Sequence, residues 1–135
     1  MLPEYEISTD PARLDISLIH EFLSGTYWAP GRSRIMVERS IKHSLCFGAY
    51  VASQQIGFAR VISDRAVFAY LADVFVLPEF RGRGIGKGLV RTILEHPELR
   101  DLKVFLLCTR DADGFYSQFG FCALPNPEEM MGRYT

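Results

Sequence analysis

Four glycines alternate with other residues in the segment FRGRGIGKGL, at positions 82, 84, 86 and 88. Between Glu79 and Arg91 this part of the chain carries one carboxylate against four cations, Arg81, Arg83, Lys87 and Arg91. Glycines allow a ligand to approach the backbone closely, and the unpaired N–H groups at a helix N-terminus bind phosphate. The segment therefore predicts a site for an anion that carries several phosphates.

Two common phosphate-binding motifs do not fit this segment. The dinucleotide fingerprint requires G-x-G-x-x-G, and the P-loop requires G-x-x-x-x-G-K-[ST]. Arg81 stands at the first glycine position of a P-loop, and Gly88 stands where serine or threonine would bind magnesium. The sequence therefore argues against a nucleotide triphosphatase.

The pattern that fits is Arg81-x-x-Gly84-x-Gly86, which follows the apolar segment VFVLP and precedes an amphipathic stretch. It resembles the acetyl-CoA-binding signature of the GNAT superfamily of N-acetyltransferases. The segment RDADGFYSQFGF resembles a second motif of that family, with matching residues Ala112, Tyr116, Gly120 and Phe121. Two motifs are more specific than either alone. The resemblance implies transfer of an acetyl group from acetyl-CoA to a primary amine.

The resemblance also implies how acetyl-CoA binds. Backbone N–H groups of the glycine loop are expected to hold the pyrophosphate, and pantetheine is expected to pair like an added strand with the strand before the loop. Thr109 stands where many members have asparagine, which is expected to alter one pantetheine contact without removing it. The cofactor-binding residues implied are Val74, Phe75, Val76, Arg81, Gly82, Arg83, Gly84, Ile85, Gly86, Lys87 and Thr109.

Tyr116 and Asp73 are the catalytic candidates. Tyr116 matches the family's usual general acid, and a phenol with a pKa near ~10 can protonate a departing CoA thiolate. The alternative is a tyrosine that serves packing alone. The glutamate that many members carry in the strand before the loop is absent, and Asp73 is the one carboxylate of YLADVFV. Asp73 either removes a proton through water, holds the substrate ammonium, or bonds local backbone donors.

The acceptor pocket of the superfamily is built largely by the first two helices and their connection, here GTYWAPGR at residues 25–32. Tyr27 and Trp28 are candidate substrate-binding residues that would wall an apolar amine or stack on a cation. The alternative is that both cover the core. A compact chain favours a small-molecule amine as acceptor. A peptide or protein N-acetyltransferase and a non-catalytic acyl-CoA-binding sensor remain the other two hypotheses.

Hydrophobic periodicity predicts the elements that position these residues. Four helices are expected, at 15–24, 33–44, 85–96 and 111–119, and the second should bury Met36, Val37 and Ile41. Strands are expected at 5–8, 45–52, 56–63, 66–77, 103–109 and 121–124, with 130–134 as a further edge strand. With the resemblance, the fold class is α+β: three layers, with a mixed, mostly antiparallel central sheet of six to seven strands flanked by about four helices.

Composition limits the other classes of function. The 135-residue chain is 48% hydrophobic and carries a net charge of −1, which fits one domain over residues 1–135 and argues against nucleic-acid binding. No run of apolar residues is long enough for a membrane helix, and MLPEYEIST is unlike a signal peptide, so a cytoplasmic protein is expected. The three cysteines lack metal-ligand spacing and are expected to be buried thiols, with no metal bound. A homodimer through the C-terminal edge is the expected assembly.

Overall fold

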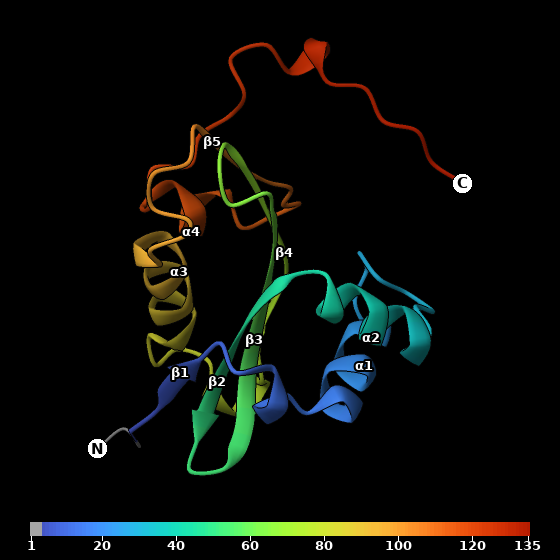
Figure 1. Cartoon of the computed structure of the whole chain (residues 1–135), viewed down its shortest axis with the longest axis vertical. Coiled ribbons are helices and arrows are strands. Elements are labelled where there is room, and N and C mark those ends of the chain that lie inside the picture. Colours follow the sequence, from blue (N-terminus) through green and yellow to red (C-terminus); the bar gives the residue numbers. More distant parts are fainter. Residues whose placement is uncertain (1–3) are drawn as a thin grey trace.

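The computed structural model describes residues 4–135, and its centre is one sheet of five strands in the order β1-β2-β3-β4-β5 (Figure 1). Neighbouring strands are antiparallel except β4 and β5, which run parallel. The mixed, mostly antiparallel sheet is as predicted. Its strands are β1 (Glu6–Ser8), β2 (Leu45–Val51), β3 (Gln54–Ser63), β4 (Phe68–Val76) and β5 (Val104–Leu107).

The prediction of six to seven strands is wrong, because residues 121–124 and 130–134 form no strand. The C-terminal segment, residues 121–135, contains only a single 3-10 turn, Pro127–Glu129, and leads away from the sheet in Figure 1. A strand is stabilised by a paired neighbour and a buried face. Met131 and Tyr134 pair with no strand and bury no face, since they are 96% and 93% exposed.

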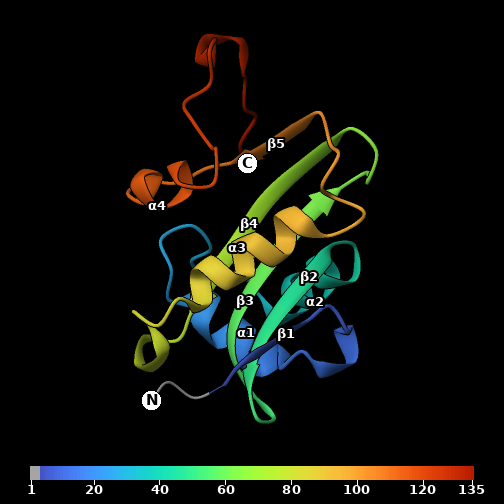
Figure 2. The ribbon, with the colours of Figure 1, turned by 90° about the vertical axis from the view of Figure 1, so that its left-hand side faces the viewer.

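The four predicted helices are present and flank the sheet, so that the molecule has three layers (Figures 1 and 2). Helices α1 and α2 cover one face, and α3 covers the other. Asp15 and Ser33 cap the first two helices, because their side chains accept hydrogen bonds from backbone N–H groups three residues later. The helices are α1 (Ile16–Ser24), α2 (Arg34–Lys42), α3 (Ile85–Glu95) and α4 (Asp113–Ser117), with short 3-10 turns at Pro11–Arg13 and Pro78–Phe80.

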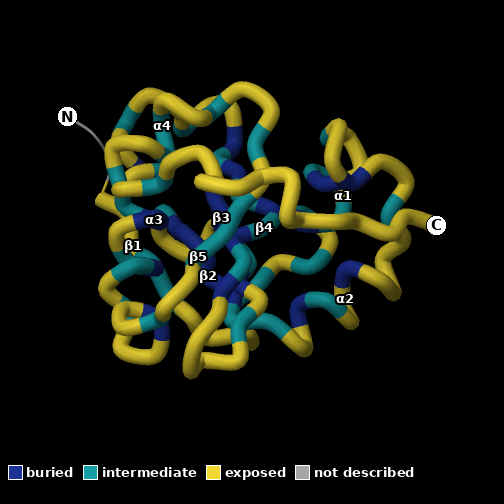
Figure 3. The backbone as a smooth tube through the Cα atoms, turned by 90° about the horizontal axis from the view of Figure 1, so that it is seen from above, coloured by how far each residue is buried: buried dark blue, intermediate teal, exposed yellow. Residues whose placement is uncertain are grey.

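Apolar side chains from all three layers form the core, and the buried backbone of the central strands stands out in Figure 3. In α2, Val37 and Ile41 are buried as predicted, whereas Met36 is 59% exposed, because it lies on the flank of the helix that faces water. Fully buried members of the core include Ile19, Phe47, Phe58, Leu89 and Ile93. No helix within residues 4–135 is long and apolar enough to cross a bilayer.

Strand β4 has two irregularities that matter for the site. Its parallel pairing with β5 ends at Leu71 and Leu107, while its pairing with β3 continues to Val76. The β3 register moves from Phe58↔Phe75 to Arg60↔Ala72, so Asp73 and Val74 oppose one residue. This is a β-bulge, and Asp73 within it has a φ of 53°, in the left-handed region. The strands β4 and β5 therefore separate where the bulge lies.

Candidate active site

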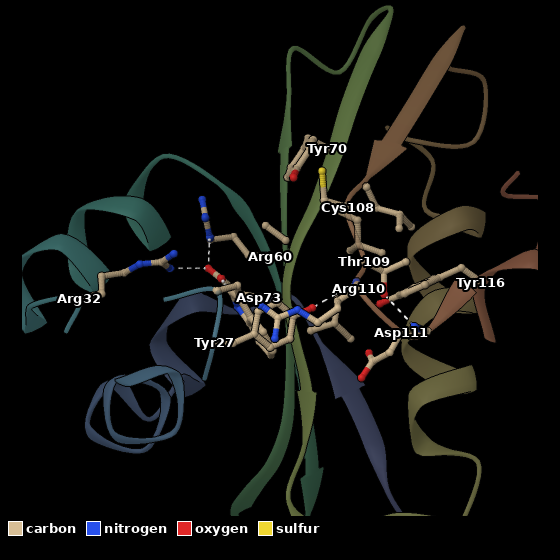
Figure 4. A pocket seen from close by; sticks show the side chains of 16 residues that line it. Tyr27, Arg32, Arg60, Tyr70, Asp73, Cys108, Thr109, Arg110, Asp111 and Tyr116 are labelled. Atoms are coloured by element: carbon tan, nitrogen blue, oxygen red, sulfur yellow. Dashed lines mark hydrogen bonds and ion pairs between the residues drawn. The ribbon is translucent and has the colours of Figure 1, made fainter. Parts of the chain in front are cut away.

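A cavity of about 430 Å³ lies where β4 and β5 separate (Figure 4). We call it the cleft. One wall is formed by β4 from Tyr70 to Val74, and another by Tyr27, Trp28 and Arg32 of the connection between α1 and α2. The connection between β5 and α4 forms the remaining wall, together with Tyr116 of α4. The structure thus brings the predicted residues Tyr27, Trp28, Asp73, Thr109 and Tyr116 into one site.

Asp73 lies in the wall of the cleft with its side chain only 2% exposed. The indole N–H of Trp28 donates to Asp73 Oδ1 at 3.0 Å. Arg32 Nη1 and Arg60 Nε donate to Oδ2 at 2.9 and 2.8 Å. Both carboxylate oxygens are therefore occupied by donors from three other residues, two of them cationic.

Tyr27 joins the two sides of the cleft. Its hydroxyl accepts a hydrogen bond from the backbone N–H of Arg110 at 3.2 Å. The guanidinium of Arg110 lies 3.7 Å from the centre of the Tyr27 ring, in a cation–π contact. Trp28 packs edge-on against the same ring. Tyr27 remains 47% exposed and Trp28 41% exposed. The predicted wall residues therefore border the cleft and do not cover the core.

Tyr116 is half-buried, with its ring packed edge-on against Phe115 and Phe121. Figure 4 shows it projecting from α4 toward the cleft. Burial is the main cause that raises the pKa of the Tyr116 hydroxyl above its ordinary value, and the nearby Tyr27 adds to the effect. The phenol therefore keeps its proton at neutral pH and can act as a donor.

The prediction of buried thiols is correct for one of the three cysteines. Cys46 is buried, and this burial raises the pKa of its thiol to about 12. Cys108 and Cys122 are exposed, because β5 is an edge strand and residues 121–124 are not part of the sheet. Cys108 lines the cleft, and its interaction with Tyr70 raises the pKa of that hydroxyl to about 12.

The glycine loop borders a second cavity, of about 250 Å³, between the end of β4 and the start of α3. We call it the loop cavity. Gly82 and Gly84 have φ angles of 76° and 81°, which side-chain-bearing residues rarely adopt. Gly84 is the N-cap of α3, so the N–H groups of the next residues have no partner within the helix. Arg81 fixes the loop to β4 through a 3.0 Å hydrogen bond from Nε to the carbonyl oxygen of Val76.

The other two glycines of the loop have different roles. A Cβ at Gly86 would point at Phe115, 3.6 Å away, within the lining of the loop cavity. A Cβ at Gly88 would overlap the Tyr5 hydroxyl. Gly88 therefore makes room for the N-terminal segment, and the prediction that the alternating glycines serve ligand approach does not hold for this one.

The predicted cofactor residues Val74, Phe75 and Val76 belong to β4, one edge of which is open beyond Leu71. From Ala72 to Val76 this edge has no strand partner within residues 4–135, because β5 stops pairing at Leu71. Val74 lines the cleft and Val76 lines the loop cavity, so the open edge runs between the two cavities. The Phe75 side chain instead stacks on Phe22 in the core, with ring centres 4.1 Å apart. Thr109 Oγ1 accepts a hydrogen bond from the N–H of Ala112 before α4.

Sequence reasoning missed three arginines of the cleft, Arg32, Arg60 and Arg110. Arg60 could have been identified from the sequence, because it is the one charged side chain in the apolar strand segment IGFARVIS. Arg32 and Arg110 lie in connections, where a cation is ordinary and no periodicity marks it. Residues 4–135 contain no group of His, Cys, Asp and Glu side chains arranged to hold a metal ion.

Comparison with known proteins agrees with this geometry. Residues 42–123 match the family model of the acetyltransferase (GNAT) domain. The chain belongs to the GNAT family of acetyltransferases. An acetyltransferase relative from Gibberella zeae is 32% identical over 130 residues, which cover 78% of this chain and 72% of that protein. The GCN5-related N-acetyltransferase 2 of Arabidopsis thaliana chloroplasts is 38% identical over 80 residues, which cover 58% of this chain and 30% of that protein.

A solved structure supports the same GNAT assignment. The GNAT-family protein from Xanthomonas campestris pv. campestris superposes on this chain with a TM-score of 0.97 at 50% identity, covering all of this chain and 96% of that one. Membership makes the protein an N-acetyltransferase. Members of the GNAT family use acetyl-CoA and act on amine acceptors.

Proposed function

We propose that the protein transfers the acetyl group of acetyl-CoA to the primary amine of a small molecule by direct attack. The observation that carries the proposal is the open edge of β4, which runs from the loop cavity to the cleft. Pyrophosphate would bind the N–H groups of residues 81–87, and pantetheine would follow Val74–Val76. The thioester would then lie in the cleft, beside Tyr116.

The reaction needs a neutral amine and a proton for the leaving thiolate. The amine nitrogen attacks the thioester carbon, a C–N bond forms, and the C–S bond breaks with its electron pair moving to sulfur. The nitrogen, which is positively charged once the C–N bond has formed, loses one proton to water. Tyr116 then donates its proton to the CoA thiolate and is reprotonated from solvent. The raised pKa of Tyr116 means that the hydroxyl still carries its proton when the thiolate leaves.

We assign Asp73 a positioning role and not that of a general base. Its two oxygens accept hydrogen bonds from Trp28, Arg32 and Arg60, and two guanidinium groups stabilise its charge. A carboxylate already held by three donors is better suited to positioning its partners than to proton transfer. The attacking amine would instead lose its proton to water, and Asp73 would orient the arginines around the acceptor.

A bridge across the cleft favours a small acceptor over a peptide. The Tyr27 hydroxyl and the Arg110 backbone bridge the cleft at 3.2 Å, which leaves no continuous groove at that point. The cavity of about 430 Å³ has room for a small amine together with the acetyl group. Tyr27 and Trp28 would contact the apolar part of that acceptor.

The deciding experiment is a CoA-release assay with acetyl-CoA and a panel of amines, polyamines, amino acids and peptides. We expect turnover with one class of small amine. Tyr116→Phe should lower kcat by about 100-fold or more, the range for loss of a general acid, while the Kd of acetyl-CoA stays unchanged. Tyr134→Phe is the matched control, because Tyr134 is 93% exposed. Wild-type kcat in Tyr116→Phe, with chemistry rate-limiting, would reject the assigned acid.

We also propose that two copies associate through the C-terminal segment. A cavity of about 530 Å³ lies between β5 and residues 121–124, lined by apolar side chains such as Phe105, Leu107 and Leu124. Beyond it the same chain carries exposed apolar residues, with Met131 96% and Tyr134 93% exposed. A second copy would cover both surfaces at once, because each copy offers an open edge and an apolar segment.

A further inference from the structure

We infer that the acceptor amine also carries a carboxylate, and that Arg32 and Arg110 bind this carboxylate in the cleft. The inference rests on the proposed acetyl transfer and names the class of acceptor. An amino acid, or another small molecule with an amine and a carboxylate, has this chemistry.

The charge of the cleft favours an anion. Among its lining residues, the three guanidinium groups of Arg32, Arg60 and Arg110 face the two carboxylates of Asp73 and Asp111. The difference is one positive charge. Asp73 is fully engaged by its three donors, and Asp111 is exposed. The lining also contains Tyr70 and Tyr116, and the raised pKa values of both hydroxyls keep them neutral near pH 7. A single carboxylate would neutralise the site.

Two of the three arginines have guanidinium N–H groups that are available to bind a ligand. Arg60 uses Nε for Asp73 and Nη1 for Ser44. Arg32 uses only Nη1 for Asp73, and its Nε and Nη2 donate to no group within residues 4–135. The guanidinium of Arg110 likewise makes no hydrogen bond within the described chain. Guanidinium groups bind carboxylates through paired N–H donors, so Arg32 and Arg110 are suited to an oxyanion.

The positions of these arginines are fixed before a ligand arrives. Asp73 holds Arg32 from one side of the cleft, and the Tyr27 ring holds Arg110 at 3.7 Å on the other (Figure 4). Little side-chain entropy is then lost when an anion binds, which favours affinity.

The first test compares matched acceptors. We would measure kcat/KM by CoA release for phenylalanine and leucine, each beside its amide and its decarboxylated amine, at equal concentrations of neutral amine. The expected preference for the amino acid is about 10-fold or more, the effect of one charged hydrogen-bonded pair. If the amide and the decarboxylated amine gave the same kcat/KM as the amino acid, the inference would be overturned. Phosphoethanolamine beside ethanolamine tests the other oxyanion, and a larger preference there would overturn the carboxylate assignment.

The second test uses variants and a readout other than turnover. Binding of 3-phenylpropionate, which has the carboxylate but no amine, is measured by calorimetry in the presence of CoA. Arg110→Gln and Arg32→Gln should each weaken it about 10-fold or abolish it, whereas Arg39→Gln on the exposed side of α2 should not. No binding to the wild type, or equal binding to all variants, would overturn the inference.

The two proposals fail in different ways. Turnover of uncharged amines that is lost in Tyr116→Phe would support the acetyl transfer while overturning the carboxylate. Carboxylate binding without any CoA release would support the anion site while overturning the transfer. Acetyl-CoA affinity, measured in every variant, shows that the donor site is intact.

Discussion

Asp73 combines structural and functional demands in one side chain, because three donors converge on a carboxylate that is 2% exposed. We expect Asp73→Ala to lower the free energy of unfolding by about 3 kcal/mol or more, since Arg32 and Arg60 lose their counterion in a partly buried place. Urea unfolding measures this change. Asp111→Ala, at an exposed carboxylate of the same cleft, should change stability by less than about 0.5 kcal/mol. A small loss in Asp73→Ala would contradict the positioning role.

The raised pKa of Tyr116 leads to a prediction about pH. The rate should rise with pH as the acceptor amine loses its proton. The fall at high pH should come later than for an ordinary phenol, because burial raises the pKa of the Tyr116 hydroxyl. The pH profile of kcat, with circular dichroism as a check on folding, measures this. A fall in kcat well below pH 10 with the protein still folded would contradict the assignment.

Among the elements, the glycine loop offers the sharpest test of the donor site. Gly86 lies in the first turn of α3 with ordinary helical backbone, so Gly86→Leu adds no backbone strain. Its side chain would fill part of the loop cavity next to Phe115. We expect the Kd of acetyl-CoA to rise about 10-fold or more, measured by calorimetry, with little change in Tm. Glu95→Leu, exposed at the far end of the same helix, is the control. Unchanged affinity in Gly86→Leu would place the pyrophosphate elsewhere.

Elements with a local signal were predictable from the sequence. Hydrophobic periodicity predicted α1, α2 and α3, and the two motifs indicated the loop, Tyr116 and the open β4 edge. Residues 121–124 could not be assigned correctly, because a short apolar run becomes a strand only if a neighbour pairs with it. The arginine cluster also escaped prediction. Arg32 and Arg60 converge on Asp73 from 41 and 13 residues away in sequence, and such contacts depend on the tertiary fold.

At the scale of the whole molecule, the C-terminal segment predicts the assembly. We expect the full chain to elute as a dimer in size-exclusion chromatography with light scattering. Met131→Glu should shift it toward monomer, because a carboxylate would be buried in the proposed interface. Met36→Glu is the matched control, since Met36 is 59% exposed on α2. A monomeric full-length chain, or a Met131→Glu variant that remains dimeric, would contradict the proposed interface.

The bulge in β4 restricts which mutational paths are open to this protein. At a φ of 53°, position 73 accepts glycine, asparagine and aspartate most readily. A longer acidic side chain would be strained in this backbone conformation and would displace both Arg32 and Arg60. Because a bulge is one extra residue opposite its partner strand, a regular strand is restored by deleting a residue and not by exchanging one. A glutamate at position 73 would therefore fit well only after a deletion in β4 had restored the regular strand. Point mutations should instead change which acceptors the protein binds, by replacing Arg32, Arg110 or Tyr27, which lie outside the sheet.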